Sequence, residues 1–116
     1  MRKMIFNVML VLIFVLSVSA NANSDETYII ENSKPNAQIV IRENAKRMAA
    51  LGALELMYYL EKITGARLPI ATKPDDRYPV KIYVGESDYA KKLGVTAEGL
   101  KYEAFRMVSG DGWLAL

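Results

Sequence analysis

The chain has 116 residues, enough for one small domain, and it contains neither cysteine nor histidine. Without these residues it can form no disulfide, no Ser-His-Asp or Cys-His catalytic group and no ordinary zinc site. The formal net charge of +2 equals the contribution of Arg2 and Lys3. The remainder of the chain is therefore neutral and shows no electrostatic signature of a nucleic-acid-binding protein.

The N-terminal segment, Met1–Ala22, has the three-part pattern of a secretory signal peptide. Two basic residues precede the apolar run Met4–Val18, and the small residues of Ala-Asn-Ala follow as a cleavage site. The run is about 15 residues long, shorter than the roughly 20 that a membrane-spanning helix needs. We predict cleavage and a secreted or periplasmic domain, residues 23–116, with no membrane association after cleavage. An uncleaved anchor is the alternative.

The first part of this domain is predicted to contain two strands separated by a turn. Thr27–Glu31 is rich in β-branched and aromatic residues, and Ala37–Ile41 reads as a second strand. Between them lies the cluster Asn-Ser-Lys-Pro-Asn, in which Pro35 is expected to prevent continued strand pairing.

A long helix is predicted over Glu43–Thr64 and ends at Gly65, a residue suited to the left-handed conformation. Glu43 is expected to pair with Arg47 four residues later. Gly52, in the middle of the helix, is expected to allow close approach of a neighbouring strand. The residues expected along the core-facing stripe are Ala45, Met48, Ala49, Gly52, Leu56, Tyr59, Leu60 and Ile63, widened by Leu51, Leu54 and Tyr58.

The next elements are a short edge strand, a polar loop, a central strand and a short helix. The edge strand is Arg67–Ala71, which contains a proline, and the loop is Thr72–Pro79. Val80–Val84 alternates as a central strand should, and Gly85 closes it. Ser87 is a suitable cap for a helix over Asp88–Leu93, which Gly94 would end.

The C-terminal part is predicted to hold one further helical turn and a hairpin. Thr96–Leu100 is the helical turn, Glu103–Val108 the first strand and Ser109–Gly112 the tight turn. The return strand from Trp113 would leave a short hydrophobic edge. From this edge we infer that the sequence is a fragment of a longer protein.

Carboxylates and glycines offer few candidates for chemistry. Asp75 and Asp76 are the only pair of adjacent aspartates, and their context favours a solvated loop over a metal or acid-base site. Glu55 and Glu61 are read as surface or boundary charges of the long helix. Gly85-Glu86-Ser87 has one glycine of the three that a dinucleotide-binding fingerprint requires, so a capped strand–helix junction is the favoured interpretation.

The aromatic residues raise the possibility of a sugar-stacking platform, because aromatic rings can pack on apolar sugar faces. Tyr59 and Tyr83 are expected to face the core and the others are dispersed, which favours packing. We therefore assign no catalytic, cofactor-binding or metal-binding residue, and no cofactor. The aromatic residues considered are Tyr58, Tyr59, Tyr78, Tyr83, Tyr89, Tyr102 and Trp113.

Two motifs in a fixed order carry a resemblance to a known family. The long helix runs into T-G-A-x-L-P-I, here Thr64–Ile70, and a later strand ends in I-x-V-G, here Ile82–Gly85. The helix also contributes Ala53, Glu55, Leu56, Tyr59 and Leu60, and the later positions are Leu100, Glu103, Phe105, Asp111 and Gly112. Over Thr27–Leu116 the chain resembles the N-terminal accessory domain of alpha-glucuronidases. It is also similar to the second domain of beta-N-acetylhexosaminidases and to the N-terminal domain of bacterial hyaluronidase-like proteins.

The resemblance implies an α+β fold of hexosaminidase domain-2 type. Its mixed β-sheet would have one long helix and a shorter helix packed on one side, and it would be incomplete at the C-terminus. Ala104 departs from the family, which usually has glycine there, and the family's next strand and helix have no counterpart in this chain. In such proteins the domain precedes a catalytic TIM barrel that carries the catalytic carboxylates. No family catalytic residue therefore maps onto this sequence.

These observations favour a non-catalytic N-terminal accessory domain of a secreted carbohydrate-active enzyme, with a glycoside hydrolase as the expected parent. The expected partner is the downstream TIM-barrel domain, and carbohydrate is a candidate ligand. Two alternatives remain open. One is a free-standing secreted module that binds a glycan or a protein, and the other is a gene fragment without a function of its own.

Overall fold

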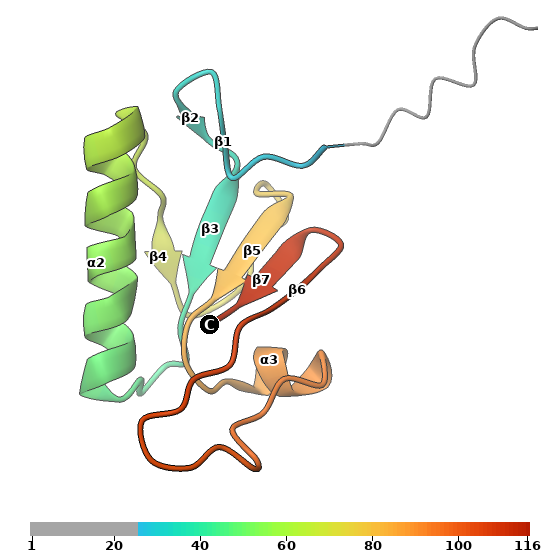
Figure 1. The fold of residues 1–116 in the computed structure, drawn as a ribbon. Helices are drawn as coiled ribbons and strands as arrows, with labels where there is room; N and C mark the ends of the chain where they lie inside the picture. The colour runs from blue at the N-terminus through green and yellow to red at the C-terminus, as the bar shows by residue number, and fades with distance from the viewer. Residues whose placement is uncertain (1–25) are drawn as a thin grey trace, which may run out of the picture.

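The protein is an α+β domain built on a five-stranded mixed sheet in the order β4-β3-β5-β7-β6 (Figure 1). The computed structural model describes residues 26–116, so the predicted signal peptide lies outside the described residues. The elements in chain order are β1 (Ile30–Glu31), β2 (Lys34–Pro35), β3 (Ala37–Val40), α2 (Arg47–Thr64), β4 (Ile70–Ala71), β5 (Val80–Tyr83), α3 (Asp88–Lys92), β6 (Val108–Gly110) and β7 (Trp113–Ala115).

The first strands form a separate two-stranded hairpin. Strand β1 pairs antiparallel with β2, and the two residues between them, Asn32 and Ser33, have φ values of 50° and 59°. Such positive φ values at both central positions characterise the tight hairpin turns that match strand twist. Pro35 lies within β2, opposite Ile30, so the prediction that this proline prevents pairing is wrong. A two-stranded ribbon accommodates proline because one side of each strand needs no hydrogen-bond donor.

Strands β3, β5 and β7 form the parallel centre of the sheet. Ile39 lies opposite Ile82, and Ile82 lies opposite Leu114. Strand β4 adds to the edge beside β3, where the main-chain oxygen of Pro69 accepts a hydrogen bond from the amide of Ile39 at 2.9 Å. The predicted central strand and the predicted edge strand are therefore confirmed.

The two helices pack on opposite faces of the sheet. Ile39, Ile82 and Leu68 belong to the core cluster that also includes Ala53 of α2. Val40 and Tyr83, the next residues along β3 and β5, instead cluster with Ala90 of α3. Because successive strand residues point to opposite faces, the two clusters lie on opposite sides. The prediction of an α+β fold with a mixed sheet is confirmed, but the prediction that both helices lie on one side is wrong.

Helix α2 begins later than predicted and ends as predicted. It starts at Arg47, and Lys46 before it provides no side-chain cap. Glu43 therefore lies outside the helix, and the predicted contact between Glu43 and Arg47 is not among the ion pairs of the described residues. At the C-terminal end, Gly65 has a φ of 77° and its amide donates to the main-chain oxygen of Glu61 at 2.7 Å.

The core-facing side of α2 is rotated from the predicted stripe. Ala53 is fully buried, and Leu56, Met57 and Leu60 pack against the core cluster beside it. Met48 and Ile63, which were expected in the stripe, are 74% and 78% exposed. Tyr59, Leu51, Leu54 and Tyr58 are also exposed. The sequence could not fix the rotation, because apolar residues lie almost all round this helix.

Close approach of α2 to the sheet occurs at Gly85 rather than at Gly52. A Cβ atom on Gly85 would lie 2.7 Å from the Cβ of Ala49, and Gly85 has a φ of 75°. A Cβ atom on Gly52 would lie 3.9 Å from Val84, an ordinary van der Waals distance. The first turn of α2 therefore packs on the end of β5, and the explanation predicted for Gly52 is wrong.

The C-terminal hairpin forms, but its position in the sheet was not predicted. Strand β6 covers Val108–Gly110, so Val108 is the one residue of the predicted strand Glu103–Val108 that lies in a strand. Thr96–Leu100 contains a turn rather than the predicted helical turn. The two residues Asp111 and Gly112 connect β6 to β7. Strand β7 lies between β5 and β6. The predicted exposed edge at the return strand is therefore wrong.

Candidate functional site

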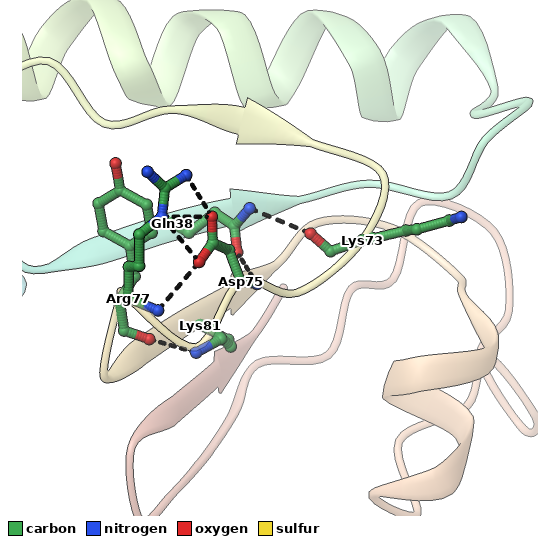
Figure 2. A network of polar contacts seen from close by, with 6 residues as sticks. Gln38, Lys73, Asp75, Arg77 and Lys81 are labelled. Carbon is green, nitrogen blue, oxygen red and sulfur yellow. Dashed lines mark hydrogen bonds and ion pairs between the residues drawn. The ribbon is translucent and has the colours of Figure 1, made fainter.

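Asp75 lies in a loop that is organised by hydrogen bonds and an ion pair (Figure 2). Its neighbour Asp76 is exposed. Arg77 donates from its main-chain amide and its guanidinium to Asp75, with the shortest contact at 2.6 Å. These hydrogen bonds from Arg77 lower the pKa of Asp75 to about 2. Asp75 is thus an ionised structural anion at neutral pH, and its oxygens are directed to Arg77.

The buried amide of Gln38 anchors the same loop to the centre of the sheet. Gln38 is 3% exposed, on the face of β3 that also carries Val40. Its Nε2 donates to the main-chain oxygen of Lys73 at 3.0 Å, and its Oε1 accepts from the amide of Asp75 at 2.9 Å. Both halves of the side-chain amide are therefore satisfied. Sequence reasoning missed this role, although a single amide within the apolar strand sequence AQIVI is a usable signal.

The predicted strand–helix junction after β5 is confirmed. The Oγ of Ser87 accepts a hydrogen bond from the amide of Ala90 at 3.1 Å and caps α3. The amide of Gly85 already donates to the main-chain oxygen of Leu116 at 2.9 Å. The turn is therefore a structural cap, and the Gly85 amide is not directed at a ligand.

The remaining acidic candidates lie at the surface of α2. Glu55 is exposed, and Glu61 approaches Arg67 at 3.9 Å in a solvent-accessible ion pair. Such exposed pairs contribute little to stability. Among residues 26–116, no group of three or more Asp, Glu, His or Cys side chains is placed to hold a metal ion.

The tyrosines do not share one platform. Tyr83 is buried and its ring stacks on Tyr89 with a centroid separation of 6.1 Å. Tyr58 and Tyr59 are both exposed and meet edge to face at 5.3 Å and 74°. The prediction that Tyr83 faces the core is confirmed and the same prediction for Tyr59 is wrong. The perpendicular Tyr58 and Tyr59 rings cannot stack together on one flat sugar face.

The strongest candidate site is an exposed apolar surface on α2. Two stripes of apolar side chains run along the outer side of the helix. One consists of Leu51, Leu54 and Tyr58, and the other of Met48, Tyr59 and Ile63. Tyr58 of the first stripe contacts Tyr59 of the second. Glu55 and Lys62 lie between the stripes at helical spacing, and the ammonium of Lys62 lies 5.7 Å from the Tyr58 ring centroid. We call this region the α2 apolar surface; its residues are Met48, Leu51, Leu54, Tyr58, Tyr59 and Ile63.

Exposure on this scale in one helix is typical of an interaction surface. A helix that is apolar on nearly all sides is normally covered on more than one side, whereas α2 buries Ala53 and packs Leu56, Met57 and Leu60 against the core on one side only. Contiguous exposed apolar residues rimmed by polar ones mark protein-protein contacts in soluble proteins. The described residues contain no helix long and apolar enough to cross a membrane.

Comparisons with known proteins leave the interpretation to the geometry: no family model, no curated protein and no solved structure matches this chain.

Proposed function

We propose that the chain is the N-terminal, non-catalytic accessory domain of a secreted carbohydrate-active enzyme. The parent would be a glycoside hydrolase whose TIM-barrel domain carries the catalytic groups. The domain would be exported through the segment Met1–Ala22. Its fold would be a variant of the hexosaminidase domain-2 type in which α3 lies on the opposite face of the sheet from α2. The motifs Thr64–Ile70 and Ile82–Gly85 support this assignment.

The single observation that carries the proposal is the α2 apolar surface. Covering its six large side chains, each 43% to 78% exposed, would contribute about 1 kcal/mol per residue. A free partner loses about 4–15 kcal/mol of translational and rotational freedom on association, which would offset most of this gain. A domain on the same polypeptide avoids much of that loss because the linker keeps its local concentration high. The surface is therefore better suited to a tethered domain than to a freely diffusing partner.

The experiment that tests the proposal is recovery of the native protein from its host. An antibody raised against the loop Thr72–Pro79 would capture the protein from the culture fluid and from a periplasmic extract, and mass spectrometry would define both ends. We expect a polypeptide that begins near Asn23, extends by the roughly 250 residues of a barrel and hydrolyses glycosides.

Two results would overturn this assignment. A secreted protein that ends at Leu116 and binds on a glycan array would instead identify a free-standing binding module. A longer secreted protein that releases no sugar from any glycoside tested would reject the glycoside hydrolase as parent.

A further inference from the structure

An apolar cavity of about 480 Å³ lies beyond the carboxyl ends of the parallel strands β3, β5 and β7. Its buried lining includes Val84, Ala90 and Ala115, and Met48, Leu100 and Phe105 contribute more exposed side chains. The size falls within the range of about 300–1,000 Å³ that is usual for small-molecule sites. The carboxyl ends of parallel strands are also where open sheets with helices on both faces bind ligands.

The charged side chains of this cavity are mostly cationic. Arg42, Lys46 and Arg106 line it, and Glu86 is the only acidic side chain in the lining. Lys46 approaches Glu86 at 3.7 Å, and Arg106 donates to the main-chain oxygens of Thr96 and Glu98. Arg42 makes no hydrogen bond or ion pair with any residue in the described range. The guanidinium of Arg42 is therefore available to a ligand.

Arg42 also borders a second, more polar cavity of about 400 Å³. That cavity shares Arg42 and Glu86 with the first and adds the polar residues Ser87, Asp88, Lys91 and Glu98. A ligand that placed a hydrocarbon or aromatic tail in the first cavity would thus place its polar end near Arg42, where the lining becomes polar. A planar guanidinium matches a carboxylate with two parallel hydrogen bonds.

We propose that this cavity binds a small amphipathic carboxylate, with its apolar tail against Val84, Ala90 and Ala115 and its carboxylate at Arg42. The site shares Met48 with the α2 apolar surface, whereas Leu51, Leu54 and Tyr58 of that surface do not line the cavity. Because the ligand site is defined by the cavity lining and by Arg42, failure of the binding test would leave the accessory-domain assignment standing.

Sodium decanoate is the test probe, titrated into the ¹⁵N-labelled full chain to concentrations several times the expected dissociation constant. The expected result is saturable one-to-one binding with a dissociation constant between about 10 µM and 1 mM. Amide shifts should be confined to the residues that line the cavity. Acetate has no tail and decyltrimethylammonium carries the opposite charge, so both should bind at least tenfold more weakly.

Two variants in the cavity and one control outside it locate the ligand. Arg42→Gln should weaken decanoate binding about three- to tenfold by removing the paired cation, whereas Arg67→Gln, outside the cavity, should leave it unchanged. Ala104→Trp places an indole in the lining and should abolish the cavity shifts while the rest of the spectrum is retained.

Three results would overturn the proposal. They are equal binding of the cationic probe, shifts confined to residues 1–22, and wild-type affinity in Arg42→Gln.

Discussion

Two long connections in this molecule differ in how they are held. The loop Thr72–Pro79 between β4 and β5 is anchored to the buried side chain of Gln38 and is internally bridged by Asp75 and Arg77. The connection between α3 and β6 is held by Arg106, which donates to Thr96 and Glu98 within the same segment. Only the first loop is tied by a side chain to the centre of the sheet.

Their exposed surfaces reflect this difference. In the connection before β6, Tyr102, Phe105 and Met107 are exposed, and Tyr102 is as accessible as in an extended chain. The loop Thr72–Pro79 contains no large hydrophobic side chain of comparable exposure. The comparison teaches that one buried side chain can satisfy the main-chain groups of a polar loop, whereas the second connection is held by hydrogen bonds within its own segment.

The largest effect is expected when the buried anchor is removed. Gln38→Ala deletes both hydrogen bonds to the loop and leaves the main-chain groups of Lys73 and Asp75 without that partner. We expect a loss of about 2–3 kcal/mol in the free energy of unfolding, measured by urea denaturation. Ser109→Ala, at an exposed position of β6, is the control and should change it by less than about 0.5 kcal/mol. A Gln38→Ala protein with wild-type stability would remove the distinction between the two loops.

A smaller effect is expected from the corresponding change in the second connection. Arg106→Gln removes two hydrogen bonds within one segment, neither of them to the core of the sheet, so global stability should fall by no more than about 1 kcal/mol. Hydrogen exchange of the amides in residues 96–107 should nevertheless accelerate, with no change in β3 or β5. A stability loss as large as that of Gln38→Ala would show that this connection is also part of the core.

The smallest effect concerns the charge of Asp75. Because hydrogen bonds from Arg77 lower the pKa of Asp75 in the folded protein to about 2, the ionised carboxylate stabilises the fold above the usual pKa of an aspartate. That contribution is lost as the pH falls from about 4 towards 2. The urea midpoint of the wild type should therefore approach that of Asp75→Asn over this interval. A constant difference between the two midpoints from pH 5 to pH 2 would contradict this account.

The sequence predicts the parts of the fold whose signals are local. The alternation of apolar and polar residues identifies β5, Gly65 marks the end of α2, and Asp111-Gly112 marks the last turn. The sequence does not predict properties that depend on tertiary placement. Apolar residues on nearly every side of α2 leave its rotation undetermined, and no local signal places β7 beside β5.

The candidate sites were less predictable than the strands. Gln38 was identifiable in principle as an amide within a buried strand, but its partners lie 35 and 37 residues away. The cavity beside Arg42 combines residues from the ends of three strands with the connection before β6. Those segments are far apart in the sequence and are brought together by the sheet, so no single sequence motif marks the cavity.

The central proposal is that another domain of the same polypeptide covers the α2 apolar surface. Met48 lies on this surface, and Met107 lies in the connection before β6; they are 74% and 63% exposed. Both should be oxidised readily by peroxide in the isolated chain, and mass spectrometry of peptides would give each rate. In the native secreted protein, the account predicts that oxidation of Met48 slows at least tenfold relative to its rate in the isolated chain. An unchanged Met48 rate would contradict it.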